Sequence, residues 1–117
     1  KLTFMLLIVL LSTFAFGQKM ETLEVQTSAV CKDCKDRIEK DMAFEKGVKE
    51  ATLNLDNKVL AVTYNSKKTD AETIKKRITE IGYDADDMKA DQEAFEALPL
   101  CCQKSPDNPH IKEQQKE

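Results

Sequence analysis

The feature of this sequence that most constrains its fold is an alternation of strand and helix patterns, which occurs twice between residues 21 and 87. In the first half, polar and apolar residues alternate over 22–27, which predicts a half-buried strand. A helix is predicted to follow, with Ser28 as its cap and its end near Phe44. Its buried face consists of apolar residues at helical spacing, namely Cys34, Ile38 and Met42.

A hairpin is predicted to open the second half. Residues 48–55 and 59–64 both alternate apolar and polar side chains, as two paired strands do. The intervening Asp56-Asn57-Lys58 predicts a tight turn, because Asp and Asn tolerate a left-handed backbone.

A second helix and a short last strand are predicted after the hairpin. Thr69 or Asp70 is the expected cap of the helix, and Gly82 is expected to end it. Residues 83–87 can then add a short edge strand. The core positions of the helix are Ile74, Ile78 and Ile81.

The order of these elements predicts an α+β fold. It is that of a ferredoxin-like βαββαβ sandwich, with a four-stranded antiparallel sheet and both helices on one face. Right-handed crossovers leave few other arrangements for elements this short. We place the domain at 18–89 and a C-terminal extension at 90–117, with a short acidic helix over 89–98 and a disordered tail beyond Cys102.

The first residues have the pattern of an export signal. Phe4–Leu11 is an uninterrupted apolar run, shorter than the roughly 20 residues that span a bilayer as a helix. Ala15 and Gly17 are small residues at the two positions that a signal peptidase inspects. We predict a signal peptide over 1–17, cleaved before Gln18, and a periplasmic or secreted mature chain; a short retained membrane anchor is the alternative.

Charge and composition exclude some functions. The chain has 18 basic and 21 acidic residues and a net charge of -3, whereas a nucleic-acid-binding domain needs a cationic face for the phosphates. The sequence has no glycine-rich phosphate loop, and its one histidine, His110, is too peripheral to act as a base. These features favour a binding protein over an enzyme.

The chemistry of the chain is concentrated at Cys31-Lys32-Asp33-Cys34, where the first strand gives way to the first helix. Unpaired N–H groups and the dipole at a helix N-terminus favour thiolate over thiol. Lys32 and Lys35 are expected to act in the same direction but to contribute little, because they are exposed charges. Two such thiolates suit a soft ion such as Cu(I) or Hg(II). Zn(II) stays an alternative, although it prefers about four ligands and the motif supplies two.

With this motif in this pattern, the sequence resembles the heavy-metal-associated domain family over residues 21–87. That family includes copper chaperones, periplasmic mercury-binding proteins and N-terminal modules of metal-pumping P-type ATPases. The segments that carry the resemblance are Cys31-x-x-Cys34, Glu45-Lys46-Gly47-Val48, Val62-Thr63-Tyr64 and Ile81-Gly82-Tyr83.

The resemblance implies a site as well as a fold. It implies that Cys31 and Cys34 bind the metal through sulfur, and that Tyr83 lies beside the metal and tunes or shields it. Many family members have Met two residues before the first Cys, where this chain has Ala29, a departure that bears on the packing beneath the loop. An acidic residue directly before the first Cys is associated with members that prefer Zn(II), and this chain has none there.

A second pair of thiols, Cys101-Cys102, lies in the C-terminal extension. The two residues are candidate additional ligands of the same ion. They could equally bind a second ion, form a vicinal disulfide, cross-link two chains or stay idle. Nothing in the sequence decides among these roles.

The expected function is binding of a soft metal ion, Cu(I) in the first place, by an exported carrier or sequestering domain. Family analogy suggests a metal-transporting membrane protein or another Cys-bearing carrier as the partner, and we expect a monomer or a metal-bridged dimer. Two alternatives use the same cysteines: a thiol-disulfide redox protein, and an interaction domain with structural disulfides.

Overall fold

The computed structural model describes residues 19–103 of the chain. Its elements are β1 (Met20–Gln26), α2 (Lys32–Ala43), β2 (Val48–Asn54), β3 (Val59–Asn65), α3 (Ala71–Ile81), α4 (Gln92–Glu96) and the 3-10 helix η1 (Leu100–Cys102). The predicted signal peptide over 1–17, its cleavage site and the predicted tail with His110 lie outside the described residues. Within 19–103, no helix is both long enough and apolar enough to cross a membrane.

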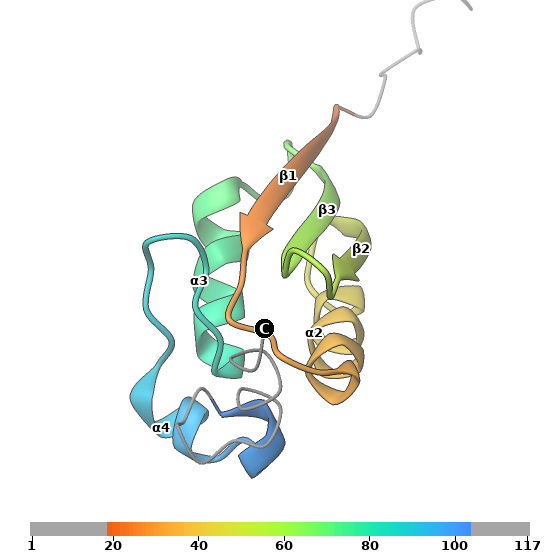
Figure 1. Ribbon diagram of the computed structural model, residues 1–117. Coiled ribbons are helices and arrows are strands. Elements are labelled where there is room, and N and C mark those ends of the chain that lie inside the picture. Colours follow the sequence, from red (N-terminus) through yellow and green to blue (C-terminus); the bar gives the residue numbers. More distant parts are fainter. Residues whose placement is uncertain (1–18, 104–117) are drawn as a thin grey trace, which may run out of the picture.

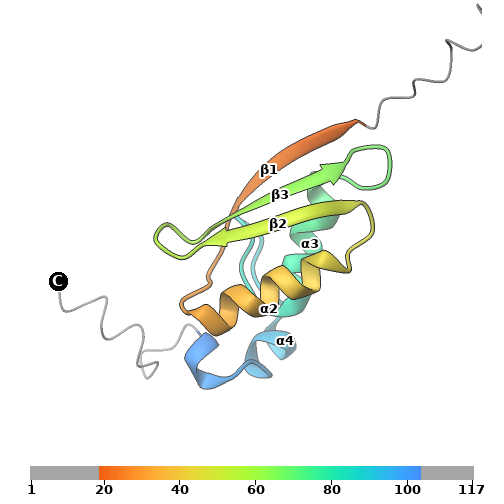
Figure 2. The same ribbon diagram turned by 90° about the vertical axis from the view of Figure 1, so that its right-hand side faces the viewer.

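The fold has two layers (Figure 1). One is an antiparallel sheet with the strand order β1-β3-β2, in which β3 is central. The other layer consists of α2 and α3, and Figure 2 shows that both helices lie on the same face of the sheet. The α+β arrangement with its two helices on one face is thus confirmed.

The core lies between these layers and follows the predicted apolar positions. Leu60, Val62 and Tyr64, which alternate along β3, are all buried. The buried helix residues predicted from their spacing are Cys34, Ile38 and Met42 on α2 and Ile74 and Ile78 on α3. Ile81, the third position predicted for α3, is only partly buried at the rim of the core.

The predicted fourth strand over 83–87 is wrong. Among the described residues the sheet has three strands, and only Ala85 continues it, through an isolated antiparallel bridge to Thr27. The chain turns at Asp86, whose φ of 53° is left-handed. The Asp86 carboxylate accepts the hydrogen bond from the Gln26 N–H, at 2.8 Å, that a strand carbonyl would otherwise take. A run of Asp and Ala also has little preference for extended structure.

Most turns and helix ends follow their local sequence. Asp70 caps α3, since its side chain accepts a hydrogen bond from a first-turn N–H at 2.8 Å. Gly82 ends the same helix with a left-handed φ of 113°. In the hairpin turn, Asn57 accepts a hydrogen bond from the Val59 N–H, but the left-handed residue is Lys58 rather than Asp or Asn.

Residues 92–102, which we call the appendage, fold back against the helical layer (Figure 2). In it, α4 contacts α3, and η1 contacts α2. The side chains of Leu98 and Cys102 are 6% and 1% exposed and belong to the domain core. The helix predicted over 89–98 is therefore shorter than expected, since α4 spans only Gln92–Glu96.

Candidate metal centre

The loop between β1 and α2 carries the Cys31-x-x-Cys34 motif and is fixed at its start. The backbone N–H and the hydroxyl of Thr27 both donate to the Lys58 carbonyl, at 2.9 and 2.8 Å. The next residue, Ser28, accepts a hydrogen bond at Oγ from the Asp84 N–H at 2.9 Å. Ser28 is thus not the cap of α2, as predicted, but a link to the loop after α3.

Cys31 is instead the N-cap residue of α2. Its backbone is extended, with φ of -147°, its carbonyl accepts the hydrogen bond of the Lys35 N–H, and its side chain makes no capping hydrogen bond. Cys34 therefore lies in the first turn, where N–H groups have no partner within the helix. Ala29 is fully buried beneath the loop, so the loop packs on the core although the family's methionine is missing.

Four thiols converge at this loop, and none of them is in a disulfide. Cys31 Sγ lies 3.4 Å from Cys34 Sγ and 3.9 Å from Cys102 Sγ. The Sγ atoms of Cys101 and Cys102 are 3.8 Å apart. Those of Cys31, Cys101 and Cys102 all lie within 4.8 Å of one another, close enough to contact one ion. We call these four residues the thiol cluster; the structure unites the two predicted pairs in it.

The thiol cluster has an inner and an outer side. Cys34 and Cys102 are 0% and 1% exposed, whereas Cys31 and Cys101 are half-buried. On the outer side, the Cys31 thiol approaches the Cys101 carbonyl at 3.7 Å, and the Cys101 thiol approaches the Asp33 carboxylate at 3.8 Å. The contact with Asp33 joins residues 68 positions apart, and no local sequence pattern predicts it.

Tyr83 lies where the family resemblance implies, beside the cysteines. Its side chain is fully buried, and its hydroxyl is near the thiols of Cys34 and Cys102. Burial, and then the proximity of these thiols, raises the pKa of Tyr83 far above its usual value, so the hydroxyl keeps its proton. That hydroxyl is close enough to these thiols to affect their pKa values, but it forms no hydrogen bond of normal geometry with a described group, which leaves a buried donor poorly satisfied.

The surroundings give the thiols different pKa values. Burial raises the pKa of Cys34, but the Cys102 thiol, the Val30 backbone and the Tyr83 hydroxyl lower it, and the net shift is downward. Burial raises the pKa of Cys31 and of Cys102, and the neighbouring Cys34 raises both further. Of Cys31, Cys34 and Cys102, Cys34 therefore ionises most readily, and a bound cation would favour loss of the other two protons.

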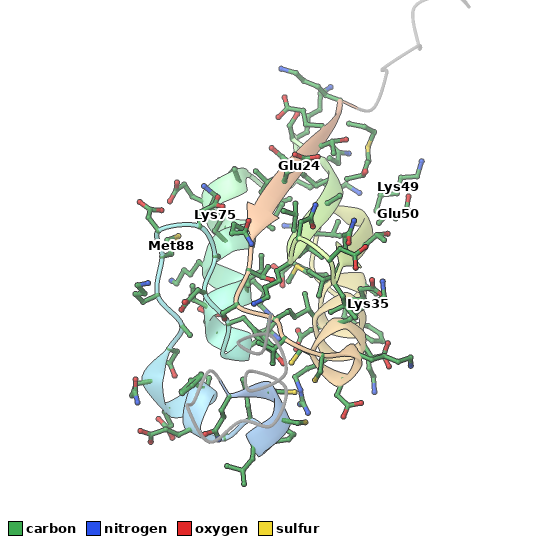
Figure 3. All side chains as sticks on the ribbon, viewed as in Figure 1. Glu24, Lys35, Lys49, Glu50, Lys75 and Met88 are labelled. Atoms are coloured by element: carbon green, nitrogen blue, oxygen red, sulfur yellow. The ribbon has the colours of Figure 1, made fainter. Side chains whose placement is uncertain are left out.

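The two lysines of the motif region are paired with groups other than the thiols. Lys32 pairs with Asp36 at 3.0 Å. Lys35 Nζ lies 2.8 Å from the Glu39 carboxylate and 2.7 Å from the Leu53 carbonyl, and Figure 3 shows Lys35 at the α2 side of the molecule. The helix terminus and the buried polar neighbours therefore favour the thiolate, and the lysines contribute little.

Comparison with known proteins identifies the family. The family model described as the heavy-metal-associated domain matches residues 27–84, from the start of the cysteine loop to the residue after Tyr83. The chain belongs to the heavy-metal-associated domain family. Its members bind heavy-metal ions, and the match includes both cysteines of the motif.

Individual relatives agree with this assignment. A copper-exporting P-type ATPase of Staphylococcus aureus (strain JH9) is 38% identical over 88 residues, which is 73% of this chain but only 11% of the ATPase. The N-terminal domain of the zinc(II) ATPase ZiaA is 34% identical, with a TM-score of 0.51 over 57% of this chain and 96% of that domain. The CopZ metallochaperone is 27% identical, with a TM-score of 0.53 over 56% of this chain and 98% of CopZ.

Proposed function

We propose that this heavy-metal-associated domain binds a soft metal ion, Cu(I) in the first place, and carries it to a partner. The observation that supports this most directly is the 3.4 Å approach of the Cys31 and Cys34 sulfurs at the N-terminus of α2. Thiolates select Cu(I) and similar soft ions over Mg²⁺ or Ca²⁺. Similarity to a copper-exporting ATPase and to CopZ favours Cu(I) over Hg(II), and the zinc ATPase relative makes Zn(II) the competitor to measure.

Charge balance is consistent with a monovalent ion at this motif. Two thiolates and Cu(I) carry a net charge of -1, which the partial positive charge at the N-terminus of α2 stabilises. Cys34, with its lowered pKa, provides the first thiolate, and Cys31 loses its proton as the ion binds. The Tyr83 hydroxyl is placed to donate a hydrogen bond to the buried Cys34 sulfur once that sulfur is anionic.

Release would proceed by ligand exchange. An incoming thiolate of the partner adds to the ion, and one of the domain's own thiolates then leaves. Cys31 is the better leaving ligand, because it is half-buried whereas Cys34 is fully buried. The partner would be a metal-transporting membrane protein or another Cys-bearing carrier, so the domain binds and transfers without catalysing a reaction of its own.

We place this activity outside the cytoplasm, on the strength of the N-terminal pattern. Cleavage after Gly17 would release a chain that begins one residue before the described part. In such an oxidising compartment thiols are at risk of disulfide formation. A bound soft ion would protect them, since both sulfurs are then ligands.

Competition for Cu(I) against a chromophoric chelator, under anaerobic reducing conditions, tests the proposal. The variant Cys31→Ser/Cys34→Ser should lose stoichiometric Cu(I) binding, whereas Lys32→Ser/Asp33→Ser, which changes only the intervening residues, should keep it. Equal Cu(I) affinity of the wild-type protein and the double cysteine variant would overturn the proposal. Repeating the titration with Zn(II) then ranks the two ions.

A thiol-disulfide function is the second candidate, and the same 3.4 Å approach of Cys31 and Cys34 favours it. A redox protein would exchange its disulfide rapidly with small thiols and would bind Cu(I) no better in its reduced form than the double serine variant does. A metal carrier shows the opposite pair of results. Thiol-disulfide exchange kinetics, followed by mass spectrometry alongside the Cu(I) titration, therefore separate the two functions.

A further inference from the structure

The carrier function uses two sulfurs, but the thiol cluster contains four. Cys102 lies 3.9 Å from Cys31 at sulfur, also neighbours the Cys34 thiol, and is almost completely buried. We propose that Cys102 is a third sulfur ligand of the ion held by Cys31 and Cys34, so that the metal site is closed and three-coordinate rather than open and two-coordinate. This inference rests on the proposed metal-binding function and specifies its ligand set.

The sulfur separations support a site with more than two ligands. With a metal–sulfur bond of about 2.3 Å, as for zinc, two sulfurs lie about 4.6 Å apart across a linear ion, and three lie about 4.0 Å apart around a planar one. The 3.9 Å between Cys31 and Cys102 matches the three-coordinate value. Cys31 and Cys34, at 3.4 Å, would have to separate slightly, which is a smaller change than a linear site requires.

The appendage holds Cys102 in place without an ion. The Cys102 N–H donates to the Pro99 carbonyl at 2.8 Å, which closes the turn of η1. Gln103 Nε2 donates to the Leu98 carbonyl at 2.8 Å, and the Leu98 side chain is anchored in the core. The third sulfur is therefore preorganised, so metal binding does not require a distant segment of the chain to lose conformational entropy.

The Tyr83 hydroxyl is an independent sign that something is bound at this place. It is a fully buried donor with no hydrogen-bond partner of normal geometry among the described residues, and its neighbours are the two inner thiols, Cys34 and Cys102. A buried donor without an acceptor is unfavourable. Ionisation of either inner thiol by a bound metal would create the acceptor, because a thiolate accepts a hydrogen bond more strongly than a thiol does.

The Cys101 sulfur also lies within 4.8 Å of those of Cys31 and Cys102, but its surroundings make it the poorer ligand. Its thiol is half-buried on the outer side of the cluster and approaches the Asp33 carboxylate at 3.8 Å. Cys102 has no such carboxylate contact among the described residues and lies on the inner side with Cys34. Cys101 could complete four ligands for an ion that requires them, such as Zn(II).

A third ligand changes how the ion is released. η1 contacts α2 and lies over the cysteine loop, so a partner must displace Cys102 before or while it takes the ion. The domain would therefore hold Cu(I) more tightly, and exchange it more slowly, than a domain with the Cys31-x-x-Cys34 pair alone. Displacement of the appendage then becomes the step at which release can be controlled.

Full-length, reduced variants test the proposal. Cys102→Ser and its neighbour Cys101→Ser are the matched pair, and each is compared with wild type by Cu(I) competition and by X-ray absorption, which counts the sulfur ligands. We expect three sulfurs in wild type and in Cys101→Ser, and two in Cys102→Ser. The Cu(I) affinity of Cys102→Ser should fall at least about 10-fold, the smallest loss typical of removing even an outer partner of a metal ligand.

Two results overturn the proposal. One is that Cys102→Ser binds Cu(I) with wild-type affinity and every variant has two sulfur ligands. The other is that Cys101→Ser, rather than Cys102→Ser, loses Cu(I) affinity. Cys102→Ala repeats the measurement with no hydroxyl at the buried position, so a folding defect peculiar to serine does not decide the outcome. Failure of the ligand assignment is distinguishable from failure of the metal-binding function. If only the ligand assignment fails, Cys31→Ser/Cys34→Ser still abolishes Cu(I) binding whereas Cys102→Ser does not weaken it. If the metal-binding function fails, Cys31→Ser/Cys34→Ser has the same Cu(I) affinity as the wild-type protein.

Discussion

The cysteine loop and the appendage each supply two thiols to one cluster, but they are attached to the molecule in different ways. A backbone hydrogen bond connects the loop to the hairpin turn, the Ser28 side chain connects it to the segment after α3, and a helix of 12 residues follows it. The appendage consists of a five-residue helix and a three-residue turn, and two buried side chains, Leu98 and Cys102, anchor it to the core.

This difference separates two tasks that a metal carrier must perform. A loop that is part of the cooperative fold keeps its sulfurs in position, so it is suited to capture the ion. A short segment with few anchors opens at a lower free energy than the whole domain unfolds, so it is suited to cover and uncover the site. A shared ion would connect the two regions and stabilise both by mass action.

The largest expected effect comes from the domain core. Ile38→Ala removes a fully buried side chain of α2 and should lower the free energy of global unfolding by about 2–5 kcal/mol. Arg37→Ala, at the exposed neighbouring position, should change it by no more than about 0.5 kcal/mol. Urea denaturation followed by circular dichroism measures both. Similar losses in the two variants would mean that α2 is not anchored through this face.

Leu98→Ala also truncates a buried side chain, but in the appendage. Its main effect should be on the reactivity of Cys102 rather than on global stability. Loss of about 2 kcal/mol of packing weakens docking of the appendage and should accelerate alkylation of Cys102 by about 10- to 30-fold. The free energy of global unfolding should fall by less than in Ile38→Ala, because the appendage opens without the domain. Peptide mass spectrometry of alkylated cysteines measures this.

Leu100→Ala is the control for that comparison, because Leu100 is 75% exposed in the adjacent turn and contributes little packing. Cys102 in this variant should react as in wild type. If Leu98→Ala leaves Cys102 as protected as in wild type and instead lowers global stability as much as Ile38→Ala does, the appendage is an integral part of the domain rather than a separable cover.

Much of the domain could be predicted from sequence, because its elements are determined locally. The spacing of Ile38 and Met42, the alternation along β3, the cap at Asp70 and the left-handed Gly82 all depend on residues within one or two turns of each other. The position of Cys31 and Cys34 at a helix N-terminus follows from the same local patterns.

What sequence could not predict depends on contacts between distant residues. The fourth strand is absent from the described sheet because the Asp86 side chain replaces a carbonyl opposite Gln26, 60 positions away. Ser28 forms its hydrogen bond with Asp84 instead of capping its own helix. The approach of Cys102 to Cys31 depends on how Leu98 packs, and no periodicity over 89–102 encodes that packing.

Two helix caps provide a smaller and more closely matched test of the difference between the regions. Asp70 caps α3 and Asp91 caps α4, each by accepting a hydrogen bond from a backbone N–H, at 2.8 and 2.9 Å. Replacement of either by Ala should cost about 1 kcal/mol. In Asp70→Ala the cost should appear in global unfolding, and in Asp91→Ala it should appear as a roughly fivefold faster alkylation of Cys102.

These two cap variants are compared by the same denaturation and alkylation measurements. If Asp91→Ala lowers the global unfolding free energy as much as Asp70→Ala does and leaves Cys102 protected, then α4 unfolds together with the domain. That result would contradict the assignment of the appendage as the region that opens first.

The smallest effect concerns the segment that joins the two regions, and it depends on pH. The Gln26 N–H bound to its carboxylate and the Lys75 ammonium at 3.1 Å lower the pKa of Asp86. A carboxyl group whose pKa is lower in the folded state stabilises the fold above its unfolded pKa, and this contribution is lost as the pH falls through the folded value.

Asp86→Asn keeps an oxygen that can accept from Gln26 but removes the charge. It should therefore be less stable than wild type by under about 1 kcal/mol at neutral pH, with the difference starting to shrink at about pH 4, the pKa of an unfolded Asp, and continuing to fall toward the lower folded pKa. Glu24→Gln, an exposed change of the same kind on β1, is the control, and unfolding free energies from urea titrations between pH 7 and pH 3 measure the effect. A difference for Asp86→Asn that persists unchanged at low pH would show that the hydrogen bond to Gln26, and not the charge, connects this segment to the sheet.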